Sequence, residues 1–235
     1  MQPRIYHLCE YAVTIEMGES IDPAINDELL RLHRYISHNP FPGFRESVPA
    51  YNTLTIFYDP GEVIIHTKGN EPACVKMQDI VSRYMKNYSV EPAHETTDIE
   101  IPVCYEKEFA PDIEWVAGHC KLSIEEIIAL HTASAYRVYL IGFIPGFPYL
   151  GITDPRLEVP RKANPSLSVP AGSVALAGRQ TGIYPFAIPG GWQVIGRTPC
   201  KMFDKQNPPY CFLQPGYRVK FRAISSSEFL EICEQ

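Results

Sequence analysis

The side chains best suited to chemistry are concentrated in residues 142–199. This segment holds nine of the chain's 15 glycines and nine of its 22 prolines, with bulky apolar residues interleaved between them. Glycine and proline at this density among core-forming residues indicate sharp bends within packed β structure rather than a linker. The segment carries five basic and two acidic residues, whereas the whole chain has a net charge of −6. Cationic groups gathered beside exposed backbone N–H groups favour the binding of a small carboxylate or phosphate.

Six residues of this segment are predicted to bind the substrate. Arg179 and Arg197 can each hold an anion, although an arginine can also cap the end of a strand. Gly190 and Gly191 would present backbone N–H groups beside the large ring of Trp192, whose alternative place is the hydrophobic core. The predicted substrate-binding residues are Arg179, Thr181, Gly190, Gly191, Trp192 and Arg197.

Three residues are predicted to take part in catalysis. Gln180 and Tyr184 place an amide and a phenol in one short turn beside the hydroxyl of Thr181, a combination that suits a lactam or a carboxylate. His131 is expected at the C-terminal end of a helix, where the helix dipole favours a protonated imidazole that donates hydrogen bonds. The alternative role of His131 is to cap that helix. The predicted catalytic residues are His131, Gln180 and Tyr184.

Several kinds of site are not supported by the sequence. It contains neither the G-x-x-x-x-G-K-[ST] nor the G-x-G-x-x-G pattern, so any ATP site is expected to be unusual or shared with a partner. It has no G-x-S-x-G elbow, and Ser173 is interpreted as a turn hydroxyl rather than a nucleophile. The seven cysteines are scattered without a C-x-x-C pair, which predicts small buried residues and no metal site. An isoelectric point near 5.7 disfavours nucleic acid as a partner.

The expected location is the cytoplasm. The stretch from Met1 to Met17 lacks the features of a signal peptide, and no apolar run is long enough to span a bilayer.

The pattern of elements predicts an α+β protein with two domains. Residues 1–92 are expected to form a small N-terminal α/β domain, with one helix starting at Asp22-Pro23 and a second after Pro72. Residues 93–235 are expected to form a β-barrel domain, with a capping box at Ser123 and Glu126 ahead of most of its strands. The strands expected in it are 136–144, 174–177, 183–188, 192–197, 210–213 and 217–223.

Several motifs carry a resemblance to a known family. The runs GFIPGFPYLG, DPRLEVPR, VPAGSVALAG, QTGIYP and PGGWQVIGRTP occur in that order. Together they resemble the family once called allophanate hydrolase subunit 1, which includes the B subunit of bacterial 5-oxoprolinase and a sporulation-kinase inhibitor. The resemblance implies a cyclophilin-like barrel for the second domain.

The resemblance also implies a function. The chain would be the B subunit of an ATP-dependent 5-oxoprolinase, inactive alone, which opens 5-oxo-L-proline to L-glutamate with homologues of the C and A subunits. ATP would be a co-substrate at a site shared with a partner, Arg179 or Arg197 would hold carboxylate or phosphate, and Gln180 and Tyr184 would stabilise charge on the carbonyl oxygen. Two alternatives remain: a binding protein that inhibits a sensor histidine kinase, and a component that processes urea-like or allophanate-like amides.

Overall fold

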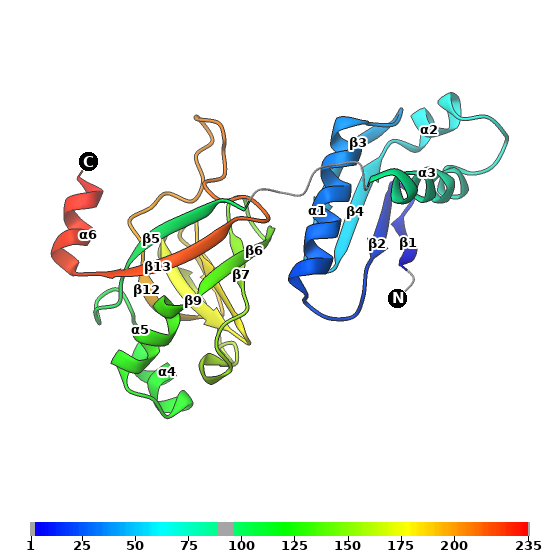
Figure 1. Ribbon diagram of the computed structural model, residues 1–235. Coiled ribbons are helices and arrows are strands. Elements are labelled where there is room, and N and C mark those ends of the chain that lie inside the picture. The colour runs from blue at the N-terminus through cyan, green and yellow to red at the C-terminus, as the bar shows by residue number, and fades with distance from the viewer. Residues whose placement is uncertain (1–2, 89–95, 235) are drawn as a thin grey trace. The chain divides into compact units, whose positions relative to one another are not determined.

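The chain folds into two compact units, Met1–Glu95 and Thr96–Gln235 (Figure 1). The computed structural model describes residues 3–88 and 96–234. The predicted domain boundary between residues 92 and 93 lies outside the described residues. Each unit has its own hydrophobic core, and the predicted α+β class with a barrel is confirmed.

The N-terminal unit is a four-stranded antiparallel sheet in the order β1-β2-β4-β3. Its strands are β1 (Arg4–Cys9), β2 (Ala12–Glu16), β3 (Phe44–Pro49) and β4 (Thr53–Tyr58). Its helices are α1 (Pro23–His38), α2 (Pro60–His66) and α3 (Ala73–Asn87). Because side chains alternate along a strand, β2 and β4 turn one apolar row toward the buried residues of α1 and α3.

Capping residues set the helix starts in this unit. The side chain of Asp22 accepts a hydrogen bond from the Ala24 N–H, and Pro23 occupies the first turn, so α1 begins where the sequence predicts. The side chain of Asp59 accepts a hydrogen bond from the Glu62 N–H in the same way, and Pro60 occupies the first turn of α2.

The C-terminal unit is built on a closed seven-stranded barrel in the order β10-β7-β6-β13-β5-β12-β9. The barrel strands are β5 (Asp98–Cys104), β6 (Ala135–Ile141), β7 (Pro148–Gly151), β9 (Ser173–Ala177), β10 (Gln180–Ile183), β12 (Gln193–Arg197) and β13 (Arg218–Ile224). A separate two-stranded sheet pairs β8 (Ser166–Val169) with β11 (Ile188–Gly190).

Helices accompany the barrel. They are α4 (Ile113–Cys120), α5 (Ile124–Ala133), α6 (Ser226–Cys233) and the short 3-10 helix η2 (Pro155–Leu157). The predicted capping box at the start of α5 is present, since Ser123 and Glu126 accept each other's backbone N–H groups.

Two predicted strands are wrong. Residues 210–213 contain only an isolated bridge between Cys211 and Phe203, because prolines at 208, 209 and 215 confine this segment to turns. The strand predicted over 183–188 is interrupted, because Pro185 cannot donate to a β ladder, so β10 ends at Ile183 and β11 begins at Ile188.

The barrel wall separates two clusters of apolar side chains. Val174 and Leu176 of β9 point into the barrel core, whereas the alternate residues Ala175 and Ala177 belong to a second cluster with Tyr184 and Trp192. The second cluster lies outside the barrel wall, and it positions the candidate site.

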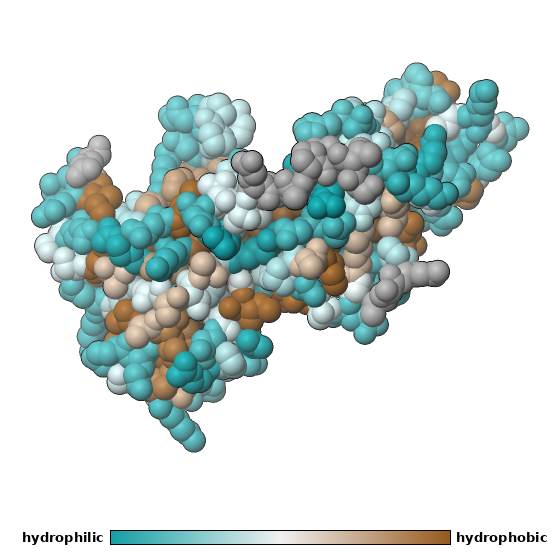
Figure 2. All heavy atoms as spheres, in the orientation of Figure 1, coloured by the Kyte–Doolittle hydropathy of each residue, from teal (hydrophilic) through white to brown (hydrophobic). Residues whose placement is uncertain are grey.

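Hydrophilic residues predominate on the face drawn in Figure 2, where apolar patches are small. The prediction that the cysteines are buried is confirmed for Cys104 and wrong for Cys9 and Cys233, which are exposed, while the other four are partly buried. Within the described residues, no helix combines the length and the apolar character needed to cross a membrane.

Candidate functional site

A small cavity lies against the outer face of the barrel, over the cluster that contains Tyr184 and Trp192. Its volume is about 180 Å³. The lining residues come from the β6–β7 loop, β7, the segment between η2 and β8, the end of β10, and the β11–β12 turn. They are Phe143, Phe147, Tyr149, Arg161, Lys162, Pro165, Tyr184, Gly190, Gly191 and Trp192.

Aromatic rings packed edge to face form the apolar wall. The Phe147 ring centroid lies 5.2 Å from that of Tyr184 and 5.5 Å from that of Trp192, with interplanar angles of 82° and 87°. Tyr149 approaches Trp192 at 5.8 Å in a similar geometry. This packing is favourable for aromatic quadrupoles and fixes each ring in place, so the wall is pre-formed.

Arg161 supplies a positive charge above this wall. Its Cζ atom lies 5.9 Å from the centroid of the Trp192 ring, within the range of a cation–π interaction. Among the described residues, Arg161 forms no ion pair, so its charge is available to an anionic ligand.

Lys162 is held differently, because its charge is matched by a carboxylate. Its Nζ atom lies 2.6 Å from Oδ2 of Asp112 and donates to Oγ of Ser166 at 3.1 Å. The Lys162 backbone N–H donates to the Gly191 carbonyl at 2.7 Å. Lys162 therefore joins the rim of the cavity to the β11–β12 turn.

Asp112 ties α4 to the barrel as well as to Lys162. Its Oδ2 accepts the Val194 N–H at 2.7 Å, and its own N–H donates to the Val194 carbonyl at 3.0 Å. The side chains of Asp112 and Lys162 are only 17% and 19% exposed, so the ion pair is partly desolvated.

Tyr184 presents a neutral phenol to the cavity. The residue is 2% exposed, and burial raises its pKa, while a hydrogen bond from the Trp192 backbone and the charge of Arg161 act in the opposite direction. A neutral phenol can donate its hydroxyl hydrogen, so Tyr184 can donate a hydrogen bond to a ligand. The Cβ of any larger residue at Gly190 would lie 2.4 Å from Oη of Tyr184, so glycine is required there.

The structure brings four of the predicted site residues together: Tyr184, Gly190, Gly191 and Trp192 all line the cavity. These four come from the end of β10 and from the β11–β12 turn, which the barrel places side by side.

The structure does not bring the predicted arginines to this cavity. Arg197 lines another depression of about 310 Å³ and donates its Nε–H to the Ala171 carbonyl at 2.8 Å. At roughly 3.3 Å per residue, its position is about 16 Å along the chain from Trp192. Arg179 donates to the Thr153 carbonyl at 3.3 Å. Neither Arg179 nor Arg197 therefore lines the cavity that contains Tyr184.

His131, Thr181 and Gln180 also lie apart from this cavity. His131 is fully buried; its Nδ1 lies 2.7 Å from the Tyr105 hydroxyl and its Nε2 lies 3.0 Å from Oγ1 of Thr181. The ring stacks on Phe221 at 4.5 Å, within the barrel core. Gln180 lies on β10 opposite Gly151 and is not among the lining residues.

The expectation that His131 is protonated is wrong. Burial lowers its pKa to about 3, so the imidazole is neutral near pH 7. The helix-end effect is worth only about 0.3–1 kcal/mol at an exposed site, which is less than the cost of desolvating an imidazolium.

Sequence reasoning missed Arg161, Lys162 and Asp112 as site residues. The adjacent cations at 161 and 162, set between Pro160 and Pro165, were a usable signal because they stand in the cationic segment. Asp112 gave no such signal, since it precedes Lys162 by 50 positions and is brought there only by tertiary folding.

Comparison with known proteins identifies the family. The model of the family described as carboxyltransferase domain, subdomain C and D, matches residues 3–213. The B subunit of 5-oxoprolinase from Bacillus subtilis (strain 168) is 42% identical over 231 residues, which cover 96% of this chain and 95% of that protein. The B subunit of 5-oxoprolinase from Escherichia coli O157:H7 is 37% identical, with 93% and 94% covered.

A solved structure agrees with these matches. The crystal structure of TTHA0988 is similar with a TM-score of 0.77 at 34% identity, over 92% of this chain and 40% of that one. This chain thus spans less than half of TTHA0988. The resemblance expected from the sequence motifs is confirmed: the chain belongs to the carboxyltransferase-domain family, subdomains C and D, together with 5-oxoprolinase B subunits.

Proposed function

We propose that this chain is the B subunit of an ATP-dependent 5-oxoprolinase. In this role it binds 5-oxo-L-proline and, with homologues of the A and C subunits, opens the lactam to L-glutamate. The observation that carries the proposal is the placement of Arg161 over Trp192 beside the Tyr184 phenol in a cavity of about 180 Å³. The names of the two curated relatives support the same role.

The cavity suits a small lactam acid. Its volume is below the roughly 300–1,000 Å³ that is typical of sites for drug-sized ligands, so it favours a compact molecule. A carboxylate of the ligand can form charge-assisted hydrogen bonds with Arg161. The flat lactam ring can pack on Trp192, and the lactam oxygen can accept a hydrogen bond from Tyr184.

The energy for ring opening comes from ATP in this proposal. Transfer of the γ-phosphoryl group to the lactam oxygen, with release of ADP, would make the ring carbon susceptible to water. Addition of water and cleavage of the ring C–N bond, with the nitrogen taking up a proton, would give an acyl phosphate of glutamate. A second water would then hydrolyse this acyl phosphate to glutamate and phosphate. Tyr184 would stabilise the charge that develops on the oxygen before transfer. Because the sequence has no phosphate-binding loop, we place the ATP site at the contact with the C subunit.

Reconstitution with the partner proteins tests the proposal. The chain would be co-expressed with homologues of the A and C subunits, and ATP-dependent glutamate formation would be measured for the wild type and for Arg161→Ala. We expect kcat/KM for 5-oxoproline to fall roughly 100-fold, because about 3 kcal/mol of charge-assisted binding is lost.

Arg156→Ala is the matched control. Arg156 is paired with Asp154 and lies outside the cavity, so kcat/KM should remain within about twofold of the wild type. Unchanged kinetics in Arg161→Ala would refute the assigned site. Tight binding to a histidine kinase, with loss of autophosphorylation and no association with the C subunit, would refute the proposed function and favour the inhibitor.

A further inference from the structure

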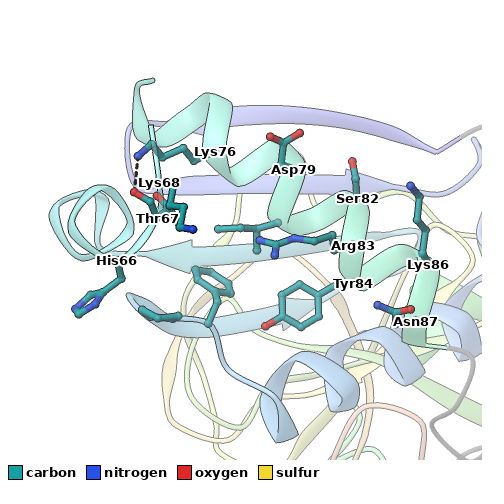
Figure 3. A pocket seen from close by; sticks show the side chains of 13 residues that line it. His66, Thr67, Lys68, Lys76, Asp79, Ser82, Arg83, Tyr84, Lys86 and Asn87 are labelled. Carbon is teal, nitrogen blue, oxygen red and sulfur yellow. Dashed lines mark hydrogen bonds between the residues drawn. The ribbon is translucent and has the colours of Figure 1, made fainter. Parts of the chain in front are cut away.

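We propose that a groove on the N-terminal unit binds an acidic segment of another polypeptide. The groove has a volume of about 890 Å³ and runs along α3 and the connection between α2 and α3 (Figure 3). We call it the basic groove, after four cations that line it. These are Lys68, Lys76, Arg83 and Lys86. Because it lies wholly within residues 41–87, the inference does not depend on the proposed function.

Most of the positive charge in the basic groove is not neutralised by carboxylates. Asp79 is the acidic residue in its lining, against four cations, whereas residues 3–88 as a whole carry eight basic and 11 acidic residues. Among the described residues, Lys68, Arg83 and Lys86 form no ion pair. By contrast, three arginines outside the groove lining each form an ion pair with a carboxylate; these are Arg4, Arg31 and Arg45.

Lys76 is a fixed cation in the wall of the groove. The residue is only 6% exposed, and its Nζ donates to the carbonyl oxygens of Thr67 and Gly69 at 3.0 and 2.8 Å. These bonds tie the α2–α3 connection to α3, as Figure 3 shows for Thr67. Carbonyl dipoles solvate the ammonium without cancelling its charge, so Lys76 adds to the positive potential of the groove.

The helix dipole does not account for this arrangement. A cation is favourable near the C-terminal end of a helix, which explains Lys86 in the last turn of α3. Lys76 lies near the N-terminal end of the same helix, where the dipole disfavours a positive charge. Lys68 lies beyond the end of α2, in the connection. A binding role explains the shared location of these cations better than dipole compensation does.

The spacing of the cations favours an extended peptide over a nucleotide. At about 1.5 Å per residue, Lys76 and Lys86 are separated by roughly 15 Å along α3. An extended chain at about 3.3 Å per residue covers that distance with roughly five residues. Nucleotide phosphates are usually held at the N-terminus of a helix, whereas Arg83 and Lys86 lie toward the C-terminal end of α3. Phe41 and Tyr84 also line the groove and provide apolar surface for a peptide backbone.

A labelled acidic peptide tests the inference on the full chain. The probe is a fluorescein-labelled peptide with about five consecutive glutamates, the length that matches the groove. Fluorescence anisotropy gives its Kd for the wild type and for Lys68→Glu/Lys86→Glu at low and at raised salt. We expect wild-type binding that weakens with salt, and a Kd at least roughly tenfold higher in the variant.

Matched controls separate the groove from net charge. Lys205→Glu/Lys220→Glu changes the net charge equally, at two exposed lysines of the other unit, and should leave the Kd within about twofold. The same peptide with glutamine in place of glutamate should not bind. Equal weakening by both double variants, no binding of the glutamate peptide to the wild type, or displacement of the peptide by ATP at concentrations below the peptide Kd would overturn the inference.

Discussion

The ammonium of Lys162 lies 2.6 Å from Oδ2 of Asp112, and that oxygen also accepts the Val194 backbone N–H. One carboxylate thus holds a cavity cation and the strand β12 at the same time. Since the charge of Lys162 is balanced by Asp112, Arg161 carries the positive charge left for a ligand. The ion pair organises the cavity, and Arg161 is the residue expected to meet a carboxylate.

Asp112→Asn should destabilise the C-terminal unit. The variant leaves the partly buried Lys162 ammonium without its counter-charge, which costs about 3 kcal/mol for a pair of this kind. Both tryptophans of the chain, Trp115 and Trp192, lie in this unit, so urea unfolding followed by tryptophan fluorescence reports on it. Lys162→Met added to Asp112→Asn should recover part of the loss. No recovery in the double variant would show that the bond to Val194, rather than the ion pair, carries the stability.

Gly190→Ala should damage the cavity, whereas Gly191→Ala should be tolerated. The new Cβ at Gly190 would lie 2.4 Å from Oη of Tyr184, so the phenol has to move. At Gly191 the nearest atom would be Cγ of Pro165 at 3.6 Å, an ordinary contact. We expect Gly190→Ala to lose about 1–3 kcal/mol of unfolding free energy through overpacking, and to raise KM for 5-oxoproline in the assembled enzyme. Equal effects of the two substitutions would contradict the close contact with Tyr184.

Features set by neighbouring residues were predictable from sequence. Asp22 and Ser123 cap helices through bonds that reach only two or three residues, and both helix starts were predicted correctly. The interruption of the strand predicted over 183–188 was also within reach, since Pro185 lacks the N–H that a ladder needs.

The site was predictable only in part, because it depends on which side of the barrel wall each residue faces. Thr181 and Tyr184 are three positions apart, and an odd separation along a strand places side chains on opposite faces. Accordingly, Thr181 contacts His131 in the barrel core, while Tyr184 contacts Phe147 outside it. Strand alternation could have separated these two residues. By contrast, the contact between α4 and β12 that brings the carboxylate of residue 112 to the cavity could not be foreseen, since it depends on tertiary packing.

Arg197→Ala should leave catalysis nearly unchanged. Arg197 lines a different depression and donates to the Ala171 carbonyl, so its loss removes one side chain–backbone bond. We expect kcat/KM of the assembled enzyme to stay within about twofold, with about 1 kcal/mol lost from the unfolding free energy. A loss of activity as large as that expected for Arg161→Ala would return Arg197 to the site and weaken the assignment of the cavity.

The stability of the C-terminal unit should decrease as the pH falls below the ordinary pKa of histidine, because of His131. Burial lowers the folded-state pKa of His131 to about 3 from its ordinary value of 6.5. The neutral ring therefore contributes its full stability above pH 6.5, and this contribution is lost as the pH falls toward 3, because the unfolded chain takes up the proton first. Between about pH 7 and pH 5 the linkage amounts to about 2 kcal/mol.

Comparison with a variant that does not titrate isolates this effect. His131→Gln should be less stable than the wild type at about pH 7, since the bonds to Tyr105 and Thr181 are disturbed, but it should lose about 2 kcal/mol less between about pH 7 and pH 5. His119→Gln replaces an exposed ring stacked on Trp115 and keeps the buried imidazole of His131. Its unfolding free energy should therefore change with pH as that of the wild type does. Urea unfolding at the two pH values measures both variants. If the wild type and His131→Gln lost the same unfolding free energy between the two pH values, His131 would titrate normally in the folded state, and the barrel core would admit its charged form.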